Sequence, residues 1–490
     1  MDELTANKIA NEWKVKSLME EGILNWEDEI KKKEQVEFNQ LHKNLLVQYL
    51  EYIKDKKLGE ASELLVQYIK KEFFIYTTKN DNKSEIWIYK NGIYVSQGKS
   101  EIKEALRKLL GKWYSLYIVN QVMAKIEADT YIEADKFFFS KYPNEIPVEN
   151  GLLNIFTLDL NPFTPYKIFF TKLPVKFEPS ATCEKIESFL KDVLNNPEDI
   201  QVFYEIAGFA LLKEYKYEKA FMFLGYGRNG KGKTIELLKR LIGMDNCCSI
   251  PLSSLIPESF SISELFNKML NLAGDIGNKD LKETSMFKSL SGRDLVGGKR
   301  KFLPDIHFEN YAKFVFACNE LPMVYDTSKG FWDRWILLNF PYTFVTKEEY
   351  NQAEIKDMLK IRDDEIIEKI TTSEEMSGLL NEALIGLNRL ILNKKFSTTK
   401  GSEEVKMMWI KNSNSFMAFC MDYIEEDYNS KITKIELRRR YSAYCKQHKL
   451  KGKSDIVIKN TLQEVYGASE VKKEEEYERK WFWEGIKWKI

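Results

Sequence analysis

The chain has 490 residues, its 74 basic residues balance its 74 acidic ones, and 44% of its residues are hydrophobic. This length and composition predict a globular protein of about three domains. The zero net charge excludes a uniformly basic surface, so nucleic-acid binding would have to come from local basic clusters. The six cysteines show no paired metal spacing, and the sequence contains neither a signal peptide nor an apolar run of the roughly twenty residues that span a membrane. We therefore expect a cytoplasmic protein without membrane contacts.

Two N-terminal regions precede the first motif that carries chemistry. Residues 1–72 show polar helical patterns and predict a helical segment of unassigned role. From residue 73 the pattern changes to short aromatic and β-branched runs, with Asn91 and Gly92 as a predicted hairpin turn. Prolines and turn residues mark a predicted boundary near residue 180. Residues 73–180 are therefore predicted to form an α+β accessory domain with a linker.

Residues 221–234 run from an apolar strand into a glycine-rich loop whose lysines stand at a predicted helix start. Glycines let the chain approach phosphates closely, N–H groups at a helix N-terminus attract anions, and a lysine adds positive charge. The loop predicts ATP binding with Mg²⁺, and an ordinary glycine turn is the alternative. The predicted nucleotide-binding residues are Gly225, Gly227, Arg228, Asn229, Gly230, Lys231, Gly232, Lys233 and Thr234.

The loop fits the phosphate-binding pattern in two registers. Gly227–Thr234 matches the general pattern, whereas Gly225–Lys231 places its first glycine directly after the strand. We favour the second register, which makes Lys231 the phosphate-binding lysine. Gly232 then stands where a Ser or Thr usually binds the metal, so Thr234 or a water molecule would take that role.

Two later strands end in polar residues that suit the same site. Asp275 follows an apolar strand, where a carboxylate holds Mg²⁺ or orients the attacking water. Asn319 ends a second apolar strand, where its amide would contact the γ-phosphate or the water. An asparagine that caps the turn before Pro322 is the alternative. Asp275 and Asn319 are thus predicted catalytic residues, with Asp275 and Thr234 as metal ligands.

Arg334 stands directly before the apolar strand of residues 336–340 and is the predicted arginine finger. A guanidinium at a strand edge can neutralise transition-state charge on the nucleotide of a neighbouring subunit. The alternatives are a local ion pair with Asp333 or stacking on Trp332.

Basic residues that would contact DNA gather in two places, one between Asp275 and Asn319 and one in the C-terminal region. Lys288, Lys299, Arg300 and Lys301 lie between Asp275 and Asn319, where lysines and arginines neutralise backbone phosphates without selecting sequence. A solvated basic turn is the alternative.

In the C-terminal region, a capping box at Thr433, a second helix from about Ser454 and a strand-rich tail predict a winged-helix-like domain over residues 404–490. Arg439 and Lys459 are its predicted DNA contacts. A protein-binding winged helix remains open because acidic residues interrupt the basic character. Residues 346–403 are predicted to be helical.

The order of these motifs resembles the superfamily 3 helicases of phages, plasmids and large DNA viruses, in the phage/plasmid primase-helicase and poxvirus-type branch. The segments that carry the resemblance include Val148–Asn154, Lys288–Asp294, Phe316–Pro322 and Gly330–Trp335. The resemblance implies an α/β AAA+-like P-loop ATPase core over residues 181–345. It also implies a DNA-tracking hairpin near Lys299. One departure is Gly274, which stands where many members have a second acid beside the residue that matches Asp275.

The resemblance further implies an ATP-dependent DNA helicase for replication of a virus, phage or plasmid-like element, located inside the host cell. Its expected partners are single-stranded and forked DNA and further copies of itself in a ring, taken as a 3′-to-5′ hexamer. The N-terminal portion lacks a set of paired carboxylates with a histidine, so a separate primase or polymerase would supply priming. An origin-binding or loading protein without processive unwinding is the main alternative, and a small-molecule kinase is a more distant one.

Overall fold

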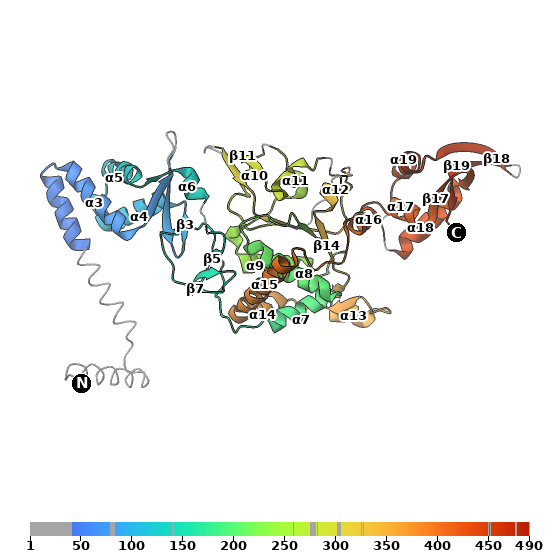
Figure 1. The fold of residues 1–490 in the computed structure, drawn as a ribbon, viewed down its shortest axis with the longest axis horizontal. Helices are drawn as coiled ribbons and strands as arrows, with labels where there is room; N and C mark the ends of the chain where they lie inside the picture. The colour runs from blue at the N-terminus through green and yellow to red at the C-terminus, as the bar shows by residue number, and fades with distance from the viewer. Residues whose placement is uncertain are drawn as a thin grey trace, which may run out of the picture. The chain divides into compact units, whose positions relative to one another are not determined.

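The computed structural model divides the chain into two compact units, Met1–Ser140 and Lys141–Ile490 (Figure 1). Asp275 and Lys301, two of the predicted site residues, lie outside the residues that the structure describes. No helix within the described residues is both long and apolar enough for a membrane span. The described residues are 42–78, 84–139, 142–257, 259–274, 281, 283–300, 305–324, 326, 328–448, 450, 452–475 and 478–489.

The first unit contains the α+β elements that the sequence predicted from residue 73 on, but Tyr49 and Leu65 of the preceding helical segment belong to the same core. Residues 42–54 are helical, and a four-stranded sheet has the order β3-β2-β1-β4. Asn91 and Gly92, both with positive φ, form the predicted turn between the antiparallel strands β2 and β3. Apolar faces of the helices pack together into one core. The elements are α3 (Leu58–Glu72), β1 (Ile75–Thr78), β2 (Glu85–Lys90), β3 (Ile93–Val95), α4 (Gly98–Leu110), η1 (Gly111–Trp113), α5 (Leu116–Asp129), β4 (Tyr131–Ile132) and α6 (Ala134–Phe138).

Residues 142–180 belong to the second unit, although the sequence predicted a boundary near residue 180. Three antiparallel strands form a small sheet here: β5 (Glu145–Val148), β6 (Gly151–Asn154) and β7 (Leu160–Asn161). Strands β5 and β6 carry apolar side chains into the main core of that unit, whereas β7 is exposed. The side chain of Asn150 accepts from the N–H of Phe177 at 2.9 Å and donates to its carbonyl at 3.0 Å, as a neighbouring strand would. The prolines of this segment therefore lie in a packed part of the second unit and do not mark a linker.

The second unit is built on a five-stranded parallel sheet of order β14-β8-β13-β10-β9. All residues of β8 and β13 are buried, as expected for strands covered on both faces. Phe209 of α8 contacts Phe221 from one face, and Phe287 of α11 stacks on Trp335 from the other. The strands are β8 (Ala220–Leu224), β9 (Cys247–Cys248), β10 (Leu270–Ala273), β13 (Lys313–Cys318) and β14 (Trp335–Asn339).

Helices that precede, separate and follow these strands along the chain complete this core. In Figure 1, α7, α8, α9 and α15 gather on one side of the sheet, and α11 and α12 on the other. A Cβ atom on Gly208 of α8 would lie 2.2 Å from the carbonyl oxygen of Ala383, so only glycine permits the close α8–α15 contact. The helices are α7 (Glu184–Val193), α8 (Pro197–Leu211), α9 (Lys231–Ile242), α10 (Phe260–Ser263), α11 (Ser285–Ser291), α12 (Lys329–Trp332), α14 (Ile366–Ile370) and α15 (Ser373–Asn393).

The region predicted to be helical, residues 346–403, is integral to the same core. The carboxylate of Glu205 on α8 is fully buried, and it accepts from Arg389 Nε at 2.8 Å and from the N–H of Ser397 at 2.8 Å. Short elements connect β14 to α14 along the chain. These are β15 (Thr343–Val345), α13 (Lys347–Gln352) and β16 (Leu359–Ile361).

The C-terminal region has a separate hydrophobic core and the predicted helix, helix and hairpin order. It starts at Ser415 and not near residue 404, because Trp409 of α16 (Ser402–Ser413) is buried in the main core and donates to the carbonyl of Pro322 at 2.8 Å. Thr433 caps α18 as predicted. The elements are α17 (Ser415–Tyr423), β17 (Ile424–Thr433), α18 (Lys434–Gln447), α19 (Asp455–Tyr466), β18 (Ser469–Glu475) and β19 (Glu478–Trp488), with sheet order β17-β19-β18.

Candidate nucleotide-binding site

The glycine-rich loop joins the end of β8 to the start of α9. Gly230 has a φ of +88° at the helix N-cap, and a Cβ atom there would lie 2.5 Å from the side chain of Val193. A Cβ atom on Gly225 would lie 2.5 Å from the carbonyl oxygen of Phe340. By contrast, nothing lies within 4 Å of a Cβ atom built on Gly227 or Gly232. Sterics therefore require the glycines of the Gly225–Lys231 register, but not those of the other register.

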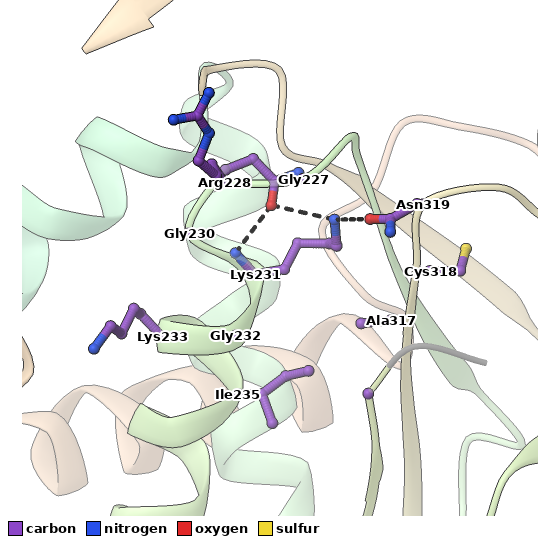
Figure 2. Close-up of a pocket in the computed structure, with 12 residues that line it drawn as sticks. Gly227, Arg228, Gly230, Lys231, Gly232, Lys233, Ile235, Ala317, Cys318 and Asn319 are labelled. Carbon is purple, nitrogen blue, oxygen red and sulfur yellow. Dashed lines mark hydrogen bonds between the residues drawn. The ribbon is translucent and has the colours of Figure 1, made fainter. Parts of the chain in front are cut away.

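The amine of Lys231 lies over the loop and is almost buried, with the residue 8% exposed. Its Nζ donates to Oδ1 of Asn229 at 3.2 Å and to Oδ1 of Asn319 at 3.1 Å (Figure 2). It also donates to the carbonyl oxygen of Gly225. Three oxygens thus hold one ammonium group beside the first turn of α9. This is the position from which a lysine would meet the terminal phosphates of a nucleotide.

Lys233 and Thr234 lie differently from Lys231. The Lys233 side chain extends from α9 away from the Lys231 amine (Figure 2), although Lys233 contributes to the same cavity wall. Thr234 is fully buried, its Oγ1 donates to the carbonyl of Gly230 at 3.1 Å, and it does not line the cavity. The hydroxyl that the sequence offered as a metal ligand is thus engaged within its own helix, because it points back along the first turn.

A cavity of about 400 Å³ opens above the loop. It lies at the carboxyl ends of parallel strands, which is where open α/β sheets bind ligands. The loop supplies most of its wall, and Gly274 after β10 and Asn319 after β13 close the far side. Gly274 directly precedes Asp275 in the sequence. Among the described residues, no group of three or more His, Cys, Asp or Glu side chains is arranged to hold a metal ion.

Arg228 connects the loop to residues that follow β14 in the chain. Its backbone has a φ of +61°, its carbonyl accepts from the N–H of Phe344 at 2.6 Å, and its Nη1 lies 3.0 Å from both carboxylate oxygens of Glu349. Glu349 also forms a capping box with Thr346 on α13. The sequence analysis did not identify Glu349, although its capping-box spacing from Thr346 was visible there.

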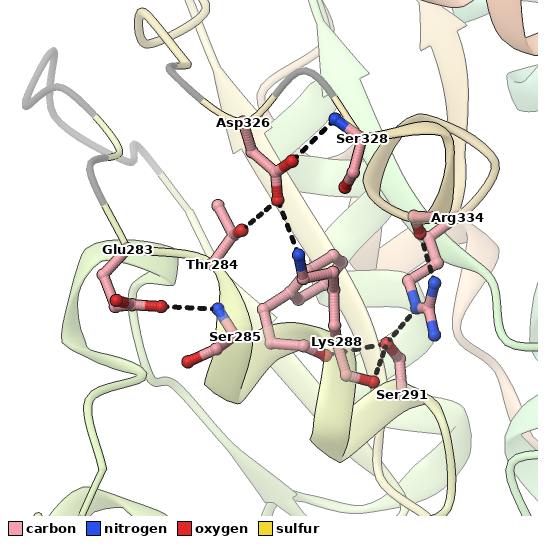
Figure 3. Close-up of polar contacts among 10 residues, drawn as sticks. Glu283, Thr284, Ser285, Lys288, Ser291, Asp326, Ser328 and Arg334 are labelled. Atoms are coloured by element: carbon pink, nitrogen blue, oxygen red, sulfur yellow. Dashed lines mark hydrogen bonds and ion pairs between the residues drawn. The ribbon is translucent and has the colours of Figure 1, made fainter.

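Arg334 lies at the opposite edge of the sheet from Lys231. It precedes β14, whose five residues span roughly 17 Å at 3.3 Å each. Its Nε donates to Ser291 Oγ at 2.9 Å (Figure 3). One Nη pairs with Glu218 at 3.1 Å, and the other contacts the carbonyl of Gly330. The partner is thus Glu218 and not Asp333. Because the side chain is only 14% exposed, these contacts hold it in one orientation.

Lys288 is engaged in an ion pair, whereas the sequence predicted a DNA contact. Its Nζ lies 2.8 Å from Asp326, which also accepts from the N–H of Ser328 at 2.8 Å and from the hydroxyl of Thr284 (Figure 3). Burial alone would raise the pKa of Asp326, but the bonds from Lys288, Ser328 and Thr284 outweigh it and hold that pKa well below its usual range. The carboxylate therefore stays charged and keeps Lys288 against the protein.

The residues Lys299 and Arg300 lie between the two strands of a β-hairpin, and the resemblance implied a hairpin here. Strand β11 (Leu295–Gly298) pairs with β12 (Ile306–Glu309) in antiparallel register. Val296, Ile306 and Phe308 are buried and anchor the hairpin in the core. Lys299 and Arg300 directly follow β11 and so begin the loop that joins the two strands.

The C-terminal domain presents a mixed surface and not a basic one. Arg439 is exposed on α18. Lys459 on α19 lies 3.6 Å from Glu470, which also pairs with Lys434. Arg438 on α18 pairs at 2.6 Å with Asp455, the first residue of α19. Acidic partners thus offset the charge of the predicted recognition helix, and DNA binding by Arg439 and Lys459 stays a prediction.

Sequence reasoning also missed Lys313, the first residue of β13. Its side chain is fully buried, and its Nζ donates to the carbonyls of Tyr311, at 2.7 Å, and Leu212. The ring centroid of Phe209 is 4.7 Å from the amine. Burial lowers the pKa of Lys313 well below its ordinary value. No sequence pattern distinguished this lysine from surface lysines.

Two family models match parts of the chain. Residues 7–195 match a family described as D5 N terminal like, and residues 223–334 match a family of unknown function (DUF5906). A protein of Sputnik virophage named putative helicase V13 is 24% identical over 345 residues, which is 66% of this chain and 42% of that protein. A protein of Acanthamoeba polyphaga mimivirus named putative helicase L207/L206 is 24% identical over 189 residues, which is 37% of this chain and 20% of that protein.

The chain therefore spans less than half the length of these two relatives. Among solved structures, an apo structure of the NrS-1 C terminal region is similar over 86% of this chain and 98% of that one, with 13% identity and a TM-score of 0.44. Together, the D5-type model and the two relatives support a relationship with viral replication helicases.

Proposed function

We propose that the chain is an ATP-dependent DNA helicase of superfamily 3 that acts in replication of a virus, phage or plasmid-like element. The observation that carries this proposal is the Lys231 amine, held by Asn229, Asn319 and the Gly225 carbonyl above a cavity at the carboxyl ends of β8 and β13. Numbered in chain order, the sheet strands run 5-1-4-3-2, which supports an AAA+-like core.

The residues present suit a nucleoside triphosphate. The N-terminus of α9 and Lys231 would face the β and γ phosphates, and Asn319 would orient the γ-phosphate or the attacking water. Asp275 and water molecules would hold Mg²⁺, because the Thr234 hydroxyl is engaged by Gly230. Bound Mg²⁺ would neutralise charge that develops on the phosphates.

The position of Arg334 supports a ring. A side chain at the amino edge of the sheet cannot reach the nucleotide site of its own chain, but it can reach one in a neighbouring copy. We propose a ring on this basis, with Arg334 as the finger supplied in trans, and we take its hexameric size from the resemblance to superfamily 3 helicases. The hairpin of β11 and β12 would carry Lys299 and Arg300 to the DNA strand, which the motor would follow from 3′ to 5′.

An origin-binding or loading protein is the second candidate. The separate core of the C-terminal domain favours it, since a winged helix can recognise a DNA site or a protein without strand separation. The two candidates differ in whether ATP hydrolysis separates strands.

The deciding experiment measures strand separation of a forked DNA duplex by the full chain with ATP. We expect Lys231→Ala to reduce strand separation and ATP hydrolysis by roughly a hundredfold or more, because it removes a charged donor from the phosphates. Lys233→Ala is the matched control and should retain most activity. Equal losses in both variants would contradict the proposed register. ATP hydrolysis without strand separation in the unmodified chain would favour the loading protein.

A further inference from the structure

The first unit carries an exposed surface where aromatic and basic side chains lie together. It covers the last turn of α4, η1 and the first turn of α5. We define it as the aromatic corner, made of Arg107, Lys108, Lys112, Trp113 and Tyr117, all of which are exposed. Neither the candidate nucleotide site nor the β11–β12 hairpin uses any of these residues.

Two aromatic rings in the corner are open to a partner. Trp113 is 47% exposed and Tyr117 is 59% exposed, although large aromatic side chains usually bury most of their surface. They are separated by only four positions along the chain, across the junction of η1 and α5. Such rings offer flat faces on which unpaired bases can stack.

Positive charge lies beside the Trp113 ring and the neighbouring Tyr114 ring. The Lys112 amine is 5.2 Å from the Trp113 ring centroid, and the Arg107 guanidinium is 5.7 Å from the Tyr114 ring centroid and donates to the carbonyl of Gly111. Lys108 pairs with Glu104 in an exposed contact, which a phosphate can replace at little cost in water. Three cations against one carboxylate make the corner complementary to a phosphate backbone.

We propose that the aromatic corner binds single-stranded DNA. Bases would stack on Trp113 and Tyr117, while Arg107, Lys108 and Lys112 contact the phosphates. The choice of ligand rests on the proposed function, because a DNA motor produces unpaired strands. Duplex DNA offers phosphates but keeps its bases stacked on each other, so the corner should prefer single strands.

The test measures equilibrium binding of a fluorescent oligothymidine to the full chain without nucleotide, over a range of salt concentrations. We expect Trp113→Ala to weaken binding about tenfold. Lys112→Glu should also weaken it and reduce the slope of log affinity against log salt by about one. Tyr131→Ala, a 48% exposed aromatic in the same unit, and Lys71→Glu, an exposed lysine on α3, are matched controls that should leave affinity unchanged. Thermal unfolding of each variant reports whether it is folded.

Photo-crosslinking of an iodouridine oligonucleotide identifies the contacted residues independently of affinity. Crosslinks to Trp113 or Tyr117 would support the proposal. Unchanged affinity in folded Trp113→Ala, or an equal loss in Tyr131→Ala, would overturn it. If the chain separates strands but crosslinks only elsewhere, the aromatic corner fails while the proposed motor stands. If it crosslinks at the corner but never separates strands, the motor fails and the corner stands.

Discussion

The two edges of the five-stranded sheet use charged side chains in opposite ways. At the carboxyl edge, Lys231 and Asn319 meet beside an open cavity. At the amino edge, Arg334 contacts Ser291 and Glu218, and Lys313 is buried. Because all five strands are parallel, these edges cannot meet within one chain. In the proposed ring, each chain would carry two separate halves of the hydrolysis site, and a second copy would bring them together.

The largest expected effect comes from variants that each remove one half. Lys231→Ala and Arg334→Ala should each lower steady-state ATP hydrolysis by about a thousandfold, because both groups stabilise transition-state charge. A random one-to-one mixture of the two variants should regain activity at about one quarter of the interfaces. At those interfaces, the intact Lys231 of one copy faces the intact Arg334 of another. Mixed assemblies without any regained hydrolysis would contradict a site shared between copies.

Asn319→Ala tests the neutral member of the carboxyl edge. Removing its amide should lower kcat for ATP hydrolysis about a hundredfold, as expected for one preorganised polar group. The KM for ATP should change much less, because Lys231 and the loop would still bind the phosphates. A large rise in KM with unchanged kcat would instead assign Asn319 to ground-state binding.

Lys313→Met tests the buried charge at the amino edge through the pH dependence of stability. Burial lowers the folded-state pKa of Lys313, so between that value and the unfolded value of about 10.4 the unfolded chain binds more protons. The unfolding free energy of the unmodified protein should therefore rise with pH in this window, and Lys313→Met should flatten that rise. Thermal unfolding between pH 7 and 10 measures it. Exposed Lys71→Met is the control, and an unchanged slope in Lys313→Met would show that another group causes it.

Glu349→Gln should have the smallest effect. It removes the carboxylate that pairs with Arg228, a residue of the cavity wall, so the guanidinium becomes available to a phosphate. We expect the KM for ATP to fall by less than about fivefold, because the ion pair is exposed to solvent. A higher KM would mean that Glu349 supports the loop and does not compete with the nucleotide.

Local patterns along the chain predicted much of this fold. The apolar run of β8 before a glycine-rich turn indicated a strand, a loop and a helix, and the structure has all three. The turn at Asn91 and Gly92 and the capped α18 were also visible. These features depend on backbone conformation or on apolar spacing over a few residues, which the sequence states directly.

Domain boundaries were predicted less well. Residues 142–180 and Trp409 were assigned to other regions, yet both pack in the main core. Turn residues and prolines indicate where the chain bends, but the burial of apolar side chains by distant segments decides which core they join.

By itself, the sequence determined a strand, a glycine-rich loop and a helix from about residue 221, and it offered Asn319 and Arg334 as polar partners. Only the tertiary structure placed the Lys231 amine beside Asn319, engaged Lys288 with Asp326, and separated Arg334 from Lys231. The physical reason is that ion pairs and hydrogen bonds depend on which strand ends and helix turns meet in space. Those meetings follow from parallel sheet order and close packing, which join residues as far apart in the chain as Glu205 and Ser397.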